Sequence, residues 1–119
     1  KQAVCISTAA GAGMKSTNKD MADSLFFWGV PKIYKMGFAV RAINWKGVTD
    51  KTRVKIDRQV DKVARQIRSH YGNAKPGLKT KAWFYAMRMV QSKFGWCAPD
   101  VKYWNEMGWT KKVRPWKGI

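Results

Sequence analysis

Residues 5–17, CISTAAGAGMKST, combine an apolar run, a loop of small residues and a Lys-Ser-Thr triplet. Loops of small residues often cradle phosphate groups, because their backbone N–H groups are free to donate. A P-loop for nucleoside triphosphates requires the pattern G-x-x-x-x-G-K-[ST]. With Lys15 and Ser16 as the final pair, the two glycines would stand where the sequence has Ala9 and Met14. The sequence therefore predicts no P-loop.

The same stretch also fails as a dinucleotide-binding fingerprint. The pattern G-x-G-x-x-G fits Gly11 and Gly13, but the third position holds Ser16. That fingerprint also needs an acidic residue about 20 positions further on, and no Asp or Glu stands between Asp23 and Asp50. A loop after a strand still places backbone amides at the carboxyl end of a sheet, where α/β folds bind ligands. Two interpretations stay open: a surface for the close approach of a flat ligand, and a plain strand-to-helix connection.

The elements that would position this loop alternate between strand and helix. Expected strands cover residues 3–8 and 32–40, and expected helices run from a cap at 16–18 to 28, then over 50–71, 79–94 and 99–107. Such alternation predicts a parallel α/β sheet. Two strands are too few to bury a parallel sheet. We therefore expect the C-terminal half of a larger fold, or a partner chain that completes the sheet.

Apolar spacing predicts which face of each helix is buried. In the first helix Met21, Leu25 and Trp28 share a stripe. The stripe of the second helix consists of Ile56, Val60, Val63, Ala64, Ile67 and Tyr71, with Asp50 as the expected N-cap and Gly72 as the expected C-cap. The helix over 79–94 is apolar nearly all round, with Trp83, Met87, Val90 and Phe94 on one face. Such a helix is expected to be buried, and binding to an anionic membrane surface is the less favoured alternative.

The chain has 119 residues, a formal net charge of +17 and 45% hydrophobic residues. This composition predicts a globular chain with its own core. Such a charge attracts anions of many kinds, including nucleic acid, acidic lipid and phosphate-bearing cofactors. One basic helix face consists of Arg58, Lys62, Arg65 and Arg68, with Lys55 nearby. A solvated surface is the favoured interpretation of this face, and a phosphate-binding stripe is the alternative.

Few residues offer catalytic or metal chemistry. Two cysteines without a CxxC motif predict no metal site and favour a reducing, cytoplasmic environment, with a Cys5–Cys97 disulfide as the minor alternative. His70 is the only histidine, and the seven carboxylates are scattered. We assign no catalytic residue and no metal ligand. Such a chain suits chemistry that a cofactor carries.

The stretches KQAVCISTAAGAGM and DSLFFWGVPKIYKMGFAV resemble the C-terminal half of flavodoxin-like NAD(P)H-dependent FMN reductases. FYAMRMVQSKFGW and DVKYWNEMGW are similar to a helical extension of some members. The resemblance implies part of a doubly wound parallel sheet in residues 1–72 and a helical C-terminal extension in residues 73–119. In the family, the loop after the fourth strand lies beside the flavin ring. Its matching positions here are Ser7, Thr8, Ala9, Ala10, Gly11, Ala12 and Gly13.

The function that the resemblance implies is oxidation and reduction through FMN. NAD(P)H would be the reductant, a small molecule the electron acceptor, and the full-length protein the enzyme. The family's phosphate loop follows its first strand and has no counterpart in these residues. A homo-oligomer or an upstream half of the fold is the implied partner. The alternative function is a basic module that binds polyanions, either nucleic acid or an anionic membrane surface, without catalysis.

Overall fold

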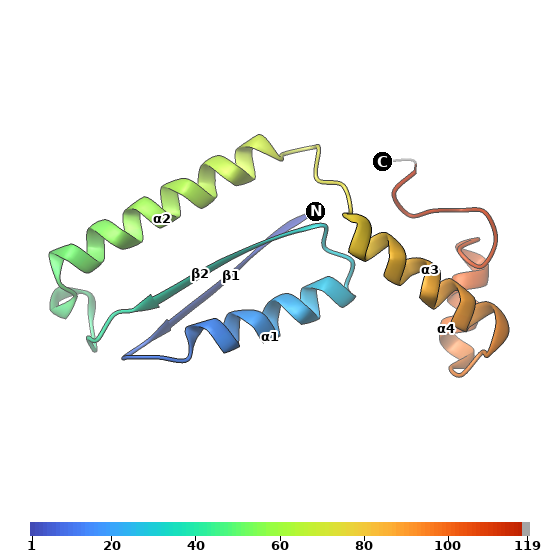
Figure 1. Ribbon diagram of the computed structural model, residues 1–119, viewed down its shortest axis with the longest axis horizontal. Helices are drawn as coiled ribbons and strands as arrows, with labels where there is room; N and C mark the ends of the chain where they lie inside the picture. The colour runs from blue at the N-terminus through green and yellow to red at the C-terminus, as the bar shows by residue number, and fades with distance from the viewer. Residues whose placement is uncertain (118–119) are drawn as a thin grey trace. The chain divides into compact units, whose positions relative to one another are not determined.

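The computed structural model describes residues 1–117. The chain divides into two compact units, Lys1–Ala74 and Lys75–Ile119. In the described residues the fold is mixed α/β, with a two-stranded parallel sheet and four α-helices (Figure 1). The predicted α/β class is therefore confirmed.

The first unit is built on one strand–helix–strand repeat. Strand β1 (Gln2–Ala9) and strand β2 (Lys32–Ala39) run parallel, in a register from Gln2 opposite Lys32 to Ala9 opposite Ala39. Helix α1 (Met14–Phe27) connects the two strands. A short 3-10 helix, η1 (Trp45–Gly47), follows β2. Helix α2 (Asp50–Ser69) then ends the unit's regular structure.

The two helices of this unit cover opposite faces of the sheet (Figure 1). Alternate residues of a strand point to opposite faces. Met36 and Phe38 of β2 form the core with Val63 of α2. Between them in the strand, Gly37 faces α1, because a Cβ built there would lie 2.8 Å from the Cβ of Met14. The strands are thus covered on both sides over part of their surface.

Helix α1 differs from its prediction in both its start and its buried face. Its N-cap is Gly13 rather than residues 16–18, and its buried residues are Asn18 and Ala22. The expected stripe is wrong at Trp28, which is 78% exposed. The physical reason is close packing: Met14 and Asn18 of α1 lie against Gly37 of β2, which has no side chain to keep the helix away from the sheet.

Helix α2 follows its prediction more closely. Ile56 and Ile67 pack beside the buried Val63, as expected. Val60 and Tyr71 are exposed instead. The N-cap is Thr49 rather than the predicted Asp50, since the Thr49 hydroxyl accepts a hydrogen bond from the backbone N–H of Thr52. Threonine is a favourable N-cap residue, although it ranks below aspartate.

The second unit contains helix α3 (Leu78–Lys93) and helix α4 (Ala98–Glu106). Their bounds lie within a residue or two of the prediction. Phe84 stacks on Trp104 with ring centroids 5.2 Å apart and contacts Trp116 edge-on at 5.0 Å. The guanidinium of Arg88 lies over the Phe84 ring at 5.0 Å. This aromatic cluster is the core of the unit.

Candidate functional site

The small-residue loop lies at the carboxyl edge of the sheet. Strand β1 ends at Ala9 and α1 begins at Met14, so residues 10–13 form the connection. Ala9 and Ala39 stand opposite each other in the parallel register, so both strands end at this same edge. Ligands of open α/β sheets bind outside this edge. The loop therefore occupies the position where ligand chemistry is expected.

The seven residues singled out from the sequence divide between strand and loop. Ser7, Thr8 and Ala9 are the last residues of β1. The Ser7 hydroxyl donates a hydrogen bond of 3.3 Å to the Met14 carbonyl, and Thr8 is exposed. The remaining four, Ala10, Gly11, Ala12 and Gly13, are all exposed. The accessible part of the predicted site is thus the loop itself.

The backbone N–H groups of Gly11, Ala12 and Gly13 donate no hydrogen bond within the described part of the chain. A Cβ built on Gly11 or Gly13 would meet no atom within 4 Å. The loop therefore offers several unpaired donors in a small-residue surface that no side chain shields. Because the loop is exposed, water solvates these N–H groups, and a polar ligand atom could accept from them in place of water.

Gly13 fixes the shape of the loop. Its φ of 99° is in the left-handed region, which costs an L-residue with a side chain about 1–2 kcal/mol. Its carbonyl accepts hydrogen bonds from the Ser16 hydroxyl at 2.8 Å and from the Thr17 backbone N–H at 3.2 Å. The Lys-Ser-Thr triplet thus supplies the first turn of α1.

Helix α1 is held in place by a buried polar contact. Asn18 is 4% exposed, and its side-chain amide donates to the Met36 carbonyl at 2.9 Å. A hollow of about 420 Å³ lies beside it, with a lining that includes Lys15, Lys19 and Lys35. A hydrogen bond from Lys19 to Asp23, together with the charge of that carboxylate, raises the pKa of Lys19. The hydrogen bond from Asn18 to the Met36 carbonyl positions the loop indirectly, because it holds the helix that follows the loop.

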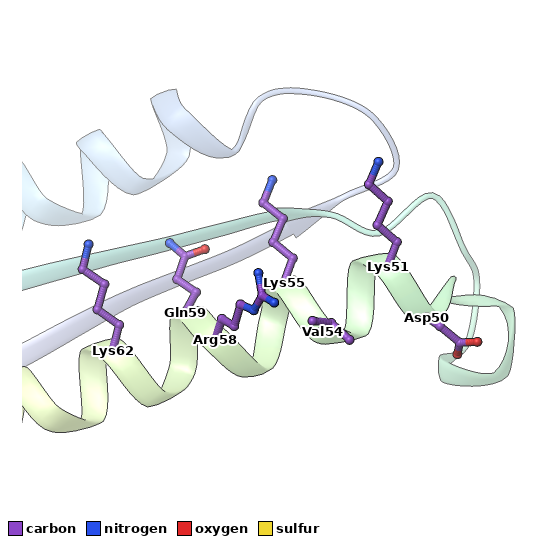
Figure 2. Close-up of a pocket in the computed structure, with 7 residues that line it drawn as sticks. All are labelled: Asp50, Lys51, Val54, Lys55, Arg58, Gln59 and Lys62. Carbon is purple, nitrogen blue, oxygen red and sulfur yellow. The ribbon is translucent and has the colours of Figure 1, made fainter.

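A second feature is a basic groove of about 690 Å³ along the first three turns of α2. Figure 2 shows Lys51, Lys55 and Lys62 projecting toward the same side of the helix. The groove is lined by Asp50, Lys51, Val54, Lys55, Arg58, Gln59 and Lys62. Of the basic face expected from the sequence, Arg58 and Lys62 line this groove with the neighbouring Lys55, whereas Arg65 and Arg68 are exposed outside it.

A polar network that the sequence did not reveal joins the strands to the end of α2. The Tyr34 hydroxyl contacts Gln2 Oε1 at 2.8 Å, His70 Nδ1 at 3.1 Å and the Gln66 carbonyl at 3.2 Å. His70 is thus part of this network. Gln2 and Tyr34 lie near the amino ends of their strands, so the network is at the opposite edge from the loop. We assign this network a structural role, since it connects the end of α2 to the sheet by hydrogen bonds.

Neither cysteine forms a disulfide: Cys5 is buried and Cys97 is exposed. In residues 1–117 no group of three or more His, Cys, Asp or Glu side chains is placed to hold a metal ion. No helix in this range is long and apolar enough to cross a membrane. Comparisons of the chain with protein-family models, with curated proteins and with solved structures find no match.

Proposed function

We propose that the chain is the C-terminal part of a flavodoxin-like, FMN-binding oxidoreductase that takes hydride from NAD(P)H and passes electrons to a small-molecule acceptor. The observation that carries the proposal is the set of unpaired N–H donors at Gly11, Ala12 and Gly13 on the carboxyl edge of a parallel sheet. Helices on both faces of that sheet also suit a doubly wound fold.

The small residues of the loop and their free N–H groups suit the flat, polar ring of FMN. A flat isoalloxazine ring can reach the backbone because residues 10–13 carry no side chain larger than a methyl group. The ring's polar nitrogen and oxygen atoms would accept from the unpaired N–H groups, and such hydrogen bonds tune a flavin's electronics. Bound FMN would supply the hydride and electron transfer itself. The residues of this chain would hold and orient the ring.

The phosphate of FMN is not assigned to any residue here. Helix N-termini bind phosphates when their first N–H groups are free. Upstream residues of the full-length protein would supply the phosphate loop, and this chain by itself would bind FMN weakly. The full-length protein is purified and scanned for the visible absorption of a bound flavin. A colourless protein that takes up no added FMN contradicts the proposal.

A second candidate function is binding of polyanions through the α2 groove. Four cations, Lys51, Lys55, Arg58 and Lys62, line the groove together with one carboxylate, Asp50; Asp57 and Asp61 stand in the same stretch of helix but do not line the groove. Neighbouring like charges repel one another and favour a bound anion. Titration of the chain against single-stranded DNA at increasing salt tests this function. Affinity that falls steeply with salt supports it, and absence of binding at low salt excludes it.

A further inference from the structure

Helix α3 presents an apolar stripe away from the core of the second unit. Leu78, Tyr85 and Met89 are spaced by seven and four residues, so they share one face of the helix. Their exposed fractions are 85%, 40% and 50%. Large apolar side chains grouped on one face indicate an interaction surface.

The opposite side of α3 packs inside the unit. Phe84 packs on Trp104 and Trp116, and Gln91 is buried. Arg88 fastens the chain beyond α4 to this side, since it donates to the Val113 carbonyl at 2.6 Å. The aromatic core leaves Leu78 and Met89 facing outward. Tyr85 lies at the edge of that core, since its ring contacts Trp116 edge-on with centroids 6.1 Å apart while the residue stays 40% exposed.

Two lysines border the stripe. At 100° per residue, Lys81 lies on one side of the line through Leu78 and Met89, and Lys93 lies on the other. Lysine side chains can extend their ammonium groups sideways while their methylene stems stay on apolar surface. An apolar stripe between cations is typical of a helix that lies in the headgroup region of a bilayer.

Charge decides which occupant fits. Residues 75–119 carry ten basic and two acidic side chains. A second copy of the unit would bring the same positive charge to the stripe and would be repelled, whereas an anionic surface would be attracted. Within the stripe, Tyr85 supplies a ring with an apolar body and a polar tip. Tryptophan and tyrosine are enriched at the interface between lipid and water.

We propose that the outward face of α3, formed by Leu78, Tyr85 and Met89 between Lys81 and Lys93, is a docking surface for an anionic lipid bilayer. The helix lies in the interface and does not cross the membrane. Its apolar side chains enter the boundary between headgroups and acyl chains, and its lysines contact lipid phosphates. This peripheral binding does not depend on flavin, because every residue involved belongs to the second unit.

Vesicle flotation of the 119-residue chain tests the docking surface. We expect the chain to float with vesicles of equal parts phosphatidylcholine and phosphatidylglycerol, and to bind vesicles of phosphatidylcholine alone far more weakly. The double variant Leu78→Ser/Met89→Ser should lower affinity about tenfold, from the apolar area it removes. The matched control Phe27→Ser/Ile43→Ser changes exposed apolar residues of the first unit that lie outside the α2 groove, and it should bind like the parent chain.

A charge variant separates the two parts of the surface. Lys81→Gln/Lys93→Gln should lower affinity for the anionic vesicles about tenfold and reduce its salt dependence. Circular dichroism confirms that each variant keeps its helices. The proposal is overturned if the parent chain binds neither vesicle, or if the folded Leu78→Ser/Met89→Ser variant binds as tightly as the parent. It is also overturned if the parent chain binds neither vesicle and gel filtration shows self-association that the Leu78→Ser/Met89→Ser variant loses.

Discussion

The side-chain amide of Asn18 donates a 2.9 Å hydrogen bond to the backbone carbonyl of Met36, linking the buried face of α1 to the centre of β2. Asn18 is only 4% exposed, so water cannot easily replace this bond. Such a contact fixes the position of α1 along the strand. The loop of residues 10–13, which immediately precedes α1, is positioned by the same contact.

Replacing this amide should destabilise the first unit. Asn18→Ala removes the donor, leaves a cavity and should lower the free energy of unfolding by about 2 kcal/mol. Urea unfolding followed by circular dichroism measures the change. Ser16→Ala removes an exposed hydrogen bond of the same helix and should cost well under half as much. An equal loss of unfolding free energy in the two variants would show that the buried hydrogen bond of Asn18 stabilises the unit no more than an exposed one.

Gly37, the one glycine in β1 and β2, should not tolerate a larger residue. Gly37→Ala would place a Cβ 2.8 Å from the Cβ of Met14 and 3.2 Å from Asn18 Nδ2. Alanine in a strand normally gains about 0.5–1 kcal/mol over glycine, but overpacking costs about 1–3 kcal/mol. We therefore expect net destabilisation, measured by thermal unfolding. The variant Gly37→Ala/Met14→Ala removes part of the Met14 side chain but keeps its Cβ, so it should not recover full stability. Complete recovery of stability in this double variant would mean that the two Cβ atoms are not crowded.

The Tyr34 hydroxyl should contribute more than an ordinary surface hydroxyl. Tyr34→Phe removes its contacts with Gln2, Gln66 and His70 and should cost about 1–2 kcal/mol of unfolding free energy. Tyr71→Phe is the matched control, because Tyr71 is 81% exposed and its hydroxyl should contribute almost nothing. Chemical denaturation of both variants gives the comparison. If the Tyr34→Phe variant is as stable as the Tyr71→Phe variant, the hydrogen bonds of the Tyr34 hydroxyl do not stabilise the first unit.

Arg88 should stabilise the second unit through its position over aromatic rings. Its guanidinium lies 5.0 Å from the Phe84 ring and 5.3 Å from the Tyr85 ring, and it donates to the Val113 carbonyl. Arg88→Met keeps much of the packing and loses the charge and the hydrogen bond. We expect a loss of about 2 kcal/mol and a weaker near-ultraviolet dichroism signal from the aromatic cluster. Lys93→Met changes an exposed cation on the same helix and should leave that signal intact.

The strands and helices were predicted well because apolar periodicity and helix-breaking residues depend only on residues close in sequence. The strand predicted over 3–8 and the helix predicted over 50–71 differ from β1 and α2 by at most two residues at each end. The face of α1 could not be predicted in this way. Asn18 is a good helix cap by type, and only the carbonyl of Met36, distant in sequence, makes it a buried contact. The apolar pattern placed Trp28 on the buried face, whereas α1 packs against Gly37 through Met14 and Asn18.

The candidate site was predictable in position but not in detail. A strand followed by small residues places a loop at the carboxyl edge of a parallel sheet, and the structure has this loop at residues 10–13. Which of its N–H groups are unpaired depends on the path of the backbone, which no pattern in the sequence gives. The assignment of FMN to the loop stays a prediction.

Titration of the full-length protein with FMN tests whether the loop of residues 10–13 binds the flavin ring. Quenching of flavin fluorescence reports binding to the parent, to a loop variant and to a control variant. Gly11→Leu adds a side chain at a position with open space, so the fold should tolerate it while the ring is blocked. Gly77→Leu is the control, since Gly77 has equal space and lies at the start of α3. The account predicts FMN binding that Gly11→Leu weakens at least about tenfold and that Gly77→Leu leaves unchanged. Equal FMN affinity in all three proteins, or none in the parent, would contradict it.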